Sequence, residues 1–84
     1  MSYGMFTQEG NELVERIVVA GAGLHNNLGD SIGQAWQFVY ANLRKLSYAE
    51  GYGEATDTEV REICAGELER LTGKTLTSDE YWAF

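Results

Sequence analysis

The chain has 84 residues, of which 44% are hydrophobic and 23% charged, with a net charge of −7 and one cysteine. This length allows one domain with a single small core, and the hydrophobic content excludes a disordered chain. The single cysteine excludes an internal disulfide framework, and neither a membrane-spanning apolar run nor a signal peptide is evident, so we expect a cytoplasmic protein.

Residues 7–24 form the first predicted element. Apolar residues recur there at helical spacing: Leu13, Ile17, Ala20 and Leu24. Thr7 can cap the start of a helix. The β-branched residues 17–19, followed by Gly21 and Gly23, leave a strand as the alternative. We predict a helix, followed by a linker at Gly23–Gly29.

Residues 31–47 carry the clearest helical pattern. Its apolar stripe consists of Ile32, Trp36, Val39, Leu43 and Leu46. Asp30 or Ser31 can cap its start. Phe38 and Ala41 lie off the stripe, so we expect this helix to be buried on two sides. Self-association through the stripe is the alternative.

Two capping boxes mark the remaining elements. Thr56 and Glu59 begin a helix that Gly73 ends, and Thr77 and Glu80 begin a short one. The apolar face of the longer helix consists of Val60, Ile63, Cys64, Leu68 and Leu71. The aromatic residues at positions 81, 82 and 84 should fold back on the bundle. The sequence therefore predicts one all-α domain over residues 1–84, a bundle of three main helices plus a short C-terminal aromatic helix.

Catalytic and cofactor motifs are weak. Gly21 and Gly23 match the start of a dinucleotide-binding glycine motif, but Asn26 occupies the position of its third glycine. Cys64 lies on an apolar stripe and His25 in a Gly/Asn-rich loop, where we expect it to be solvated. Neither residue has the ligand spacing of a zinc site. We therefore expect no enzyme, no cofactor and no metal.

Asp30-Ser31-Ile32 opens the strongest helix. It resembles the Asp-Ser-Leu/Ile signature of acyl and peptidyl carrier proteins, which are small acidic four-helix domains. The resemblance implies that Ser31 bears a phosphopantetheine arm and that Asp30 precedes it. An ordinary helix N-cap at Ser31 explains the same residues.

Acidic residues are concentrated in the second half of the chain. Residues 50–84 hold nine of the thirteen acids and three bases, which accounts for −6 of the net charge. Arg61 can pair with Asp57 and Arg70 with Glu67, and a helix places Glu67 on its solvated outer face. The predicted partner-binding residues are the carboxylates without a structural role and one interspersed tyrosine: Glu50, Glu54, Glu62, Glu69, Asp79 and Tyr52.

An acidic face attracts basic protein surfaces and is repelled by nucleic acid and anionic membranes. The sequence therefore predicts a small, non-catalytic interaction protein that binds a basic surface of a larger protein, including proteins that handle nucleic acid. In size and charge it resembles phage-encoded anti-restriction and anti-CRISPR inhibitors. A sub-hypothesis is that this chain is a DNA mimic, whose carboxylates imitate the phosphate spacing of nucleic acid. A structural or homo-oligomeric assembly protein, such as a homodimer, is the alternative.

Overall fold

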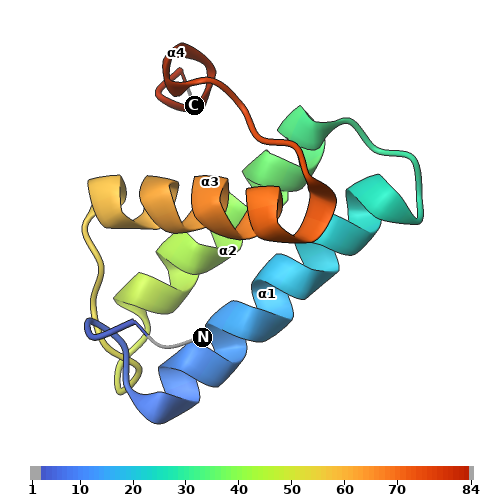
Figure 1. Ribbon diagram of the computed structural model, residues 1–84. Coiled ribbons are helices and arrows are strands. Elements are labelled where there is room, and N and C mark those ends of the chain that lie inside the picture. Colours follow the sequence, from blue (N-terminus) through green and yellow to red (C-terminus); the bar gives the residue numbers. More distant parts are fainter. Residues whose placement is uncertain (1–2, 84) are drawn as a thin grey trace.

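Four helices make up the described part of the chain, residues 3–83, in the computed structural model (Figure 1). They are α1 (Gln8–Asn26), α2 (Ile32–Tyr48), α3 (Asp57–Thr72) and the short α4 (Ser78–Tyr81). These residues contain no strand, although Phe6 and Gly53 form an isolated antiparallel bridge. The predicted all-α bundle is confirmed, and so is the choice of a helix for the first element.

Hydroxyl side chains begin all four helices. The N-cap residues are Thr7, Ser31, Thr56 and Thr77, and each side chain accepts a backbone hydrogen bond. Glu59 and Glu80 complete the two predicted capping boxes, and Gln34 completes a third with Ser31. Gly73 ends α3 in the left-handed conformation, with φ of 75°, which favours glycine.

The first linker is shorter than predicted. Gly23 lies inside α1, and its carbonyl accepts a hydrogen bond of 2.8 Å from the N–H of Asn27. The predicted linker Gly23–Gly29 is therefore wrong in its first half, because α1 continues to Asn26. The helical hydrogen bonds and the burial of Ala22 against the core outweigh the cost of about 1 kcal/mol for a glycine within a helix.

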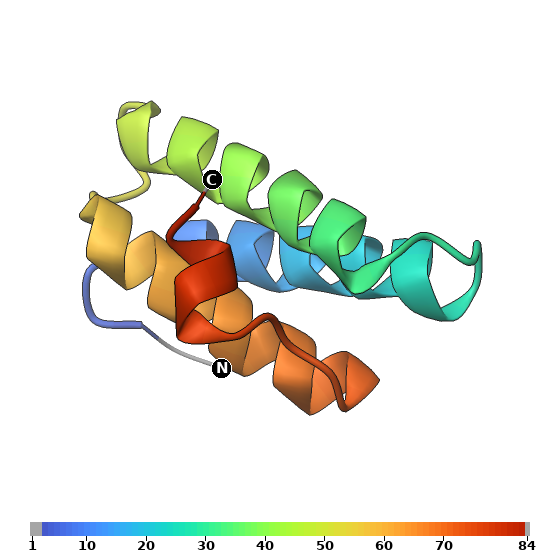
Figure 2. The ribbon, with the colours of Figure 1, turned by 90° about the horizontal axis from the view of Figure 1, so that it is seen from above.

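The core lies where the three long helices meet. α1 and α2 run antiparallel, and α3 crosses them obliquely (Figures 1 and 2). The predicted stripes of α2 and α3 are buried, and their fully buried members are Trp36, Val39, Leu43, Val60, Cys64 and Leu68. In α1 the helical spacing is confirmed, but the fully buried residues are Val14 and Val18. Leu13 and Ile17 are partly buried against the core, and Ala20 is exposed.

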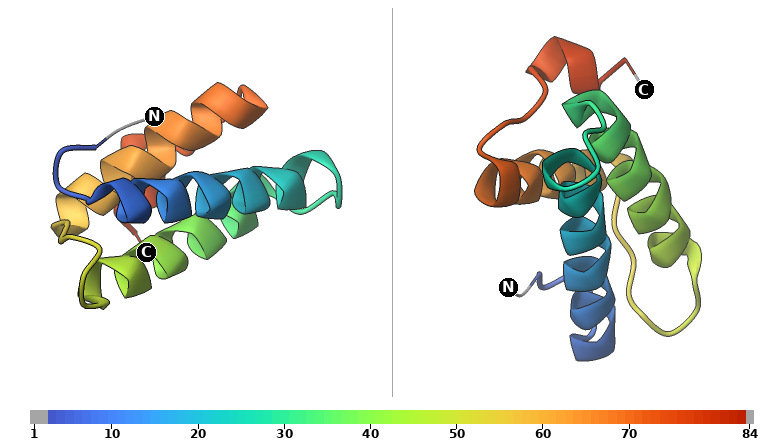
Figure 3. Two further views of the ribbon diagram at one scale, coloured as in Figure 1. Left: turned by 90° about the horizontal axis from the view of Figure 1, so that it is seen from below. Right: turned by 90° about the vertical axis from the view of Figure 1, so that its right-hand side faces the viewer.

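The two ends of the described chain pack on two sides of the bundle (Figure 3). The segment before α1 contacts both α1 and α3, since the Tyr3 backbone bonds to Asn11 and the Tyr3 hydroxyl bonds to Glu67. At the other end α4 lies over α2 and α3, and Tyr81 stacks on Trp36. The predicted folding back of the C-terminal aromatic residues is thus confirmed for Tyr81, and residue 84 lies outside the described range.

One expectation about α2 is wrong in part. α2 packs against both α1 and α3, but Phe38 is 36% exposed and Ala41 is exposed, so these two residues are not buried as expected. Most of the α2 stripe is buried inside the bundle, and self-association stays a prediction. Among residues 3–83, no helix combines the length and apolar character needed to cross a membrane.

Candidate partner-binding surface

The carboxylate of Asp57 is held by hydrogen bonds and ion pairs within the protein. Its carboxylate accepts hydrogen bonds from the Tyr40 hydroxyl at 2.5 Å and from Arg61 Nε at 2.7 Å, and Arg44 Nε lies 3.9 Å away. The Tyr40 hydrogen bond, followed by that of Arg61, lowers the pKa of Asp57 below its ordinary value. The predicted Asp57–Arg61 pair is confirmed, and Asp57 is committed to the fold.

The guanidinium of Arg61 joins three helices. Its side chain is buried, and its carbon Cζ lies 4.6 Å from the centre of the Tyr40 ring and 4.8 Å from that of Trp82. It also donates a hydrogen bond to the carbonyl of Tyr81. The Tyr81 ring is parallel to that of Trp36, with the centres 5.4 Å apart. The sequence predicted the ion pair of Arg61 but not its burial between rings from α2 and the C-terminal segment.

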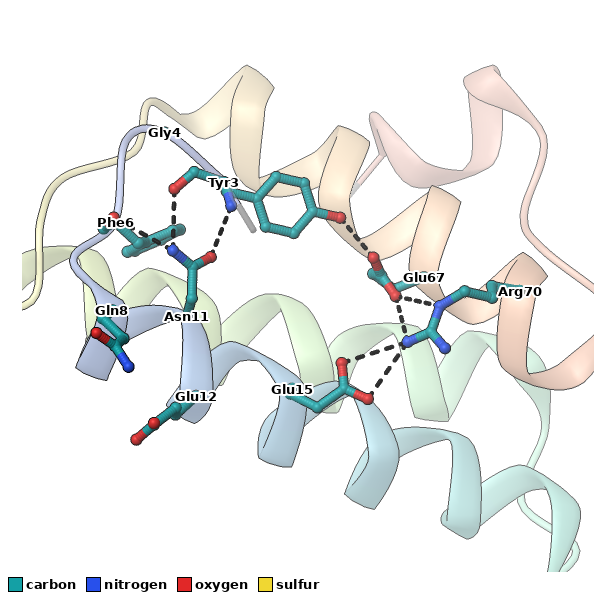
Figure 4. A pocket seen from close by; sticks show the side chains of 9 residues that line it. All are labelled: Tyr3, Gly4, Phe6, Gln8, Asn11, Glu12, Glu15, Glu67 and Arg70. Atoms are coloured by element: carbon teal, nitrogen blue, oxygen red, sulfur yellow. Dashed lines mark hydrogen bonds and ion pairs between the residues drawn. The ribbon is translucent and has the colours of Figure 1, made fainter. Parts of the chain in front are cut away.

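A second network lines an open groove of about 940 Å³ between the N-terminal segment, α1 and α3 (Figure 4). Glu67 accepts hydrogen bonds from the Tyr3 hydroxyl at 2.6 Å and from Arg70 Nε at 2.7 Å. Arg70 also reaches Glu15 at 3.3 Å. Burial, followed by the hydrogen bond to Glu67, raises the pKa of Tyr3.

The position of Glu67 corrects one prediction and confirms another. The residue is 7% exposed and does not lie on the solvated outer face of α3, because it stands between Cys64 and Leu68 on the buried side. The predicted Glu67–Arg70 pair is present. Glu67 is therefore a buried, paired acid and not part of the exposed charge.

The predicted binding carboxylates remain exposed. They are Glu50, Glu54, Glu62, Glu69 and Asp79, and within residues 3–83 none of them forms an ion pair or a side-chain hydrogen bond. Lys74 is the remaining basic residue of segment 50–83 without an ion pair among the described residues. The charged side chains of residues 50–83 that form no ion pair among the described residues are thus almost all negative.

These carboxylates occupy three neighbouring segments. Glu50 and Glu54 line a shallow depression in the α2–α3 loop, together with Tyr48. Glu62 and Glu69 are seven residues apart on α3, which places them about two turns apart on one face, roughly 10 Å along the axis. Asp79 belongs to the first turn of α4, which lies over α3 (Figure 2). The structure brings Glu50 and Glu54 together. That all five carboxylates belong to a single surface stays a prediction.

Tyr52 has a structural role in addition to its predicted one. It is half-buried and packs against the core, and its carbonyl accepts a 3.0 Å hydrogen bond from the N–H of Thr7. This contact ties the α2–α3 loop to the N-terminal segment.

Ser31 and Asp30 lie at the start of α2. The Ser31 oxygen accepts a hydrogen bond of 3.1 Å from the backbone N–H of Gln34, so the predicted N-cap is confirmed at Ser31. The carbonyl of Asp30 lies 2.8 Å from His25 Nδ1. A phosphopantetheine arm on Ser31 stays a prediction.

His25 is half-buried in the last turn of α1, so the expectation that it is solvated is wrong. Cys64 is fully buried, as predicted, and burial raises the pKa of its thiol. Within the described range 3–83, no group of three or more histidine, cysteine, aspartate or glutamate side chains is arranged to hold a metal ion.

Comparisons with known proteins give no match: no family model, no curated protein and no solved structure matches this chain.

Proposed function

We propose that this protein is a non-catalytic binding protein that docks its exposed carboxylates on a basic surface of a larger protein and modulates or inhibits that protein by occupying the surface. The docking residues are Glu50, Glu54, Glu62, Glu69 and Asp79. Proteins that handle nucleic acid are the leading partner class, because their binding surfaces are strongly basic.

In the second half of the chain two of the three bases are held in ion pairs while five exposed acids are not, and this contrast supports the proposal. Arg61 and Arg70 are used in ion pairs with Asp57 and Glu67, which are themselves tied into the fold. The five exposed carboxylates have no such partners among residues 3–83. Exposed charges of one sign steer a protein toward an oppositely charged partner and accelerate association.

Exposed aromatic rings in the same region give a docking surface its apolar anchors. Trp82 is 49% exposed and Tyr48 is 76% exposed. Trp82 lies just beyond α4, the helix that carries Asp79, and Tyr48 lines the depression with Glu50 and Glu54. Tryptophan and tyrosine are enriched among the residues that dominate binding energy.

Affinity capture from cell lysate tests the proposal. The immobilised chain is expected to retain basic proteins at low salt and to release them as salt rises, because ionic screening weakens contacts between exposed charges. The double variant Glu62→Lys/Glu69→Lys should lose most of this capture.

The matched control is Glu9→Lys/Glu12→Lys on α1. Each double variant replaces two acids by two bases and changes the net charge from −7 to −3, so the two differ only in where the charge is changed. Glu9 and Glu12 are exposed and outside the docking residues. Equal loss of capture in both variants would show that the change in net charge alone causes the loss, and would contradict a docking surface on α3.

A further inference from the structure

The depression in the α2–α3 loop contains two of the proposed docking carboxylates. It is an open hollow of about 640 Å³, which we call the loop depression, and Tyr48, Glu50 and Glu54 line it. Alanine or glycine at positions 49, 51, 53 and 55 of the lining leaves this space unfilled. Sites that hold small ligands span roughly 300–1,000 Å³, so the loop depression has room for one side chain of a partner.

The loop that carries these carboxylates is tied to the N-terminal segment (Figure 1). The Thr7 N–H donates a hydrogen bond of 3.0 Å to the Tyr52 carbonyl. The Glu54 N–H donates one of 3.2 Å to the Met5 carbonyl. Gly53 has a φ of 104°, and a Cβ there would stand 2.3 Å from the Met5 carbonyl oxygen, so only glycine fits. These contacts hold the loop in one conformation before binding, which lowers the ordering cost of an interaction.

Negative charge dominates the loop depression. Glu50 and Glu54 are exposed, and neither has an ion pair or a side-chain hydrogen bond among residues 3–83. Arg44 also lines the hollow, but its Nη2 donates a 2.5 Å hydrogen bond to the Tyr48 hydroxyl and its Nε lies 3.9 Å from Asp57, which offsets part of its charge. The surplus of negative charge favours a cationic group as the occupant.

Tyr48 favours a guanidinium over an ammonium group. A guanidinium stacks on aromatic rings and presents several N–H donors in one plane, whereas an ammonium group is compact and more strongly hydrated. Within the chain, Arg44 Cζ already lies 5.0 Å from the centre of the Tyr48 ring, and Arg61 Cζ lies 4.6 Å from that of Tyr40. Tyr48 is nevertheless 76% exposed, so ring surface remains for a second guanidinium.

We infer that the loop depression binds one arginine side chain of the partner, whose guanidinium pairs with Glu50 and Glu54 and stacks on Tyr48. This inference rests on the proposed function, because it names the side chain that one part of the docking surface accepts. Proteins that handle nucleic acid contact phosphate oxygens through arginine. The two carboxylates take the place of those oxygens, because a guanidinium binds both kinds of group through paired N–H donors.

Titration with N-acetyl-arginine amide, followed by backbone amide NMR spectra of the isotope-labelled chain, tests the pocket directly. The shifts should be concentrated on residues 47–56 and should saturate at millimolar probe. N-acetyl-lysine amide at the same ionic strength should bind several-fold more weakly. N-acetyl-citrulline amide, the uncharged analogue of the arginine probe, should cause no saturable shift.

The double variant Glu50→Gln/Glu54→Gln should weaken binding of the arginine probe about tenfold, and Tyr48→Ala about threefold. All three positions are exposed, so these variants should fold. The matched control is Glu9→Gln/Glu12→Gln, at exposed positions of α1 outside the loop depression. Each double variant removes two acids and changes the net charge from −7 to −5. The control should bind the arginine probe like the wild type.

Equal affinity of the two double variants for the arginine probe would overturn the pocket, and so would the absence of a saturable shift in the loop. Equal binding of the lysine probe would contradict the choice of arginine. Capture from cell lysate separates the pocket from the proposed function. Capture that is lost in Glu62→Lys/Glu69→Lys but unchanged in Glu50→Gln/Glu54→Gln would contradict the pocket alone. A wild-type chain that binds the arginine probe but captures no basic protein would contradict the proposed function alone.

Discussion

Gly21 of α1 packs directly against Val39 of α2. A Cβ on Gly21 would stand 2.2 Å from Val39 Cγ2, far inside van der Waals contact, so the buried Val39 side chain or the helices themselves would have to move. We expect Gly21→Ala to destabilise the protein by about 1–3 kcal/mol, even though alanine is the better helix former by about 1 kcal/mol. Urea denaturation followed by circular dichroism measures this difference.

Gly66→Ala is the matched control for Gly21→Ala. Gly66 also lies inside a helix, but nothing stands within 4 Å of the position of its Cβ. This variant should gain about 0.5–1 kcal/mol in the free energy of unfolding, because alanine loses less backbone entropy than glycine. A gain of the same size in Gly21→Ala would show that the close approach of α1 and α2 is absent.

The same contact explains why the sequence predicted the helices well but did not predict which apolar residues of α1 are fully buried. Capping residues and apolar spacing are local signals, and they identified the helix starts and the stripes of α2 and α3. α1 carries two overlapping apolar arcs with the same period, one through Leu13 and Ile17 and one through Val14 and Val18. The close approach at Gly21 decides which arc turns inward, and periodicity contains no information about it.

In the candidate site, too, contacts within one helix were predicted, whereas contacts between distant segments were not. The Asp57–Arg61 and Glu67–Arg70 pairs follow from spacing within one helix and were predicted. The burial of Arg61 and Glu67 was not predicted, because the groups that cover them come from distant parts of the chain. Tyr3 lies 64 residues before Glu67, and Tyr81 lies 20 residues after Arg61.

Stability at low pH should depend on Asp57. Its pKa in the folded protein lies below the ordinary value of 3.8, so its contribution is fully present above that value and is lost as pH falls through the folded pKa. Asp57→Asn should lower stability at neutral pH and flatten its decline below pH 3.8. Urea denaturation at a series of pH values gives both effects.

Glu62→Gln serves as the control for the Asp57 variant. It removes an exposed carboxylate that has no ion pair among residues 3–83. The control should leave stability at neutral pH unchanged, since exposed groups of this kind contribute little. If Asp57→Asn behaves like the control, the hydrogen bonds of Asp57 do not stabilise the fold.

Tyr81 should hold α4 on the bundle, because its ring covers the fully buried Trp36. Tyr81→Ala should cost about 2 kcal/mol, release α4, and accelerate tryptic cleavage after Lys74. In a Trp82→Phe background, the emission of Trp36 should shift to longer wavelength. Tyr48→Ala removes a tyrosine that is 76% exposed and should leave that emission unchanged. An unshifted spectrum in both variants would mean that Tyr81 does not anchor α4.

Variants of Ser31 distinguish a helix-capping role of its hydroxyl from a role as the attachment site of a phosphopantetheine arm. Its hydroxyl oxygen caps α2, so Ser31→Ala should lower the free energy of unfolding by about 1 kcal/mol. Ser31→Asp should keep the stability of the wild type, because aspartate caps as well as serine, but it has no hydroxyl to bear a phosphopantetheine arm. Incubation with coenzyme A and a phosphopantetheinyl transferase should leave the mass of the wild-type chain unchanged if Ser31 acts only as a cap. A mass increase in the wild type that is absent from Ser31→Asp would contradict that role and favour a carrier protein.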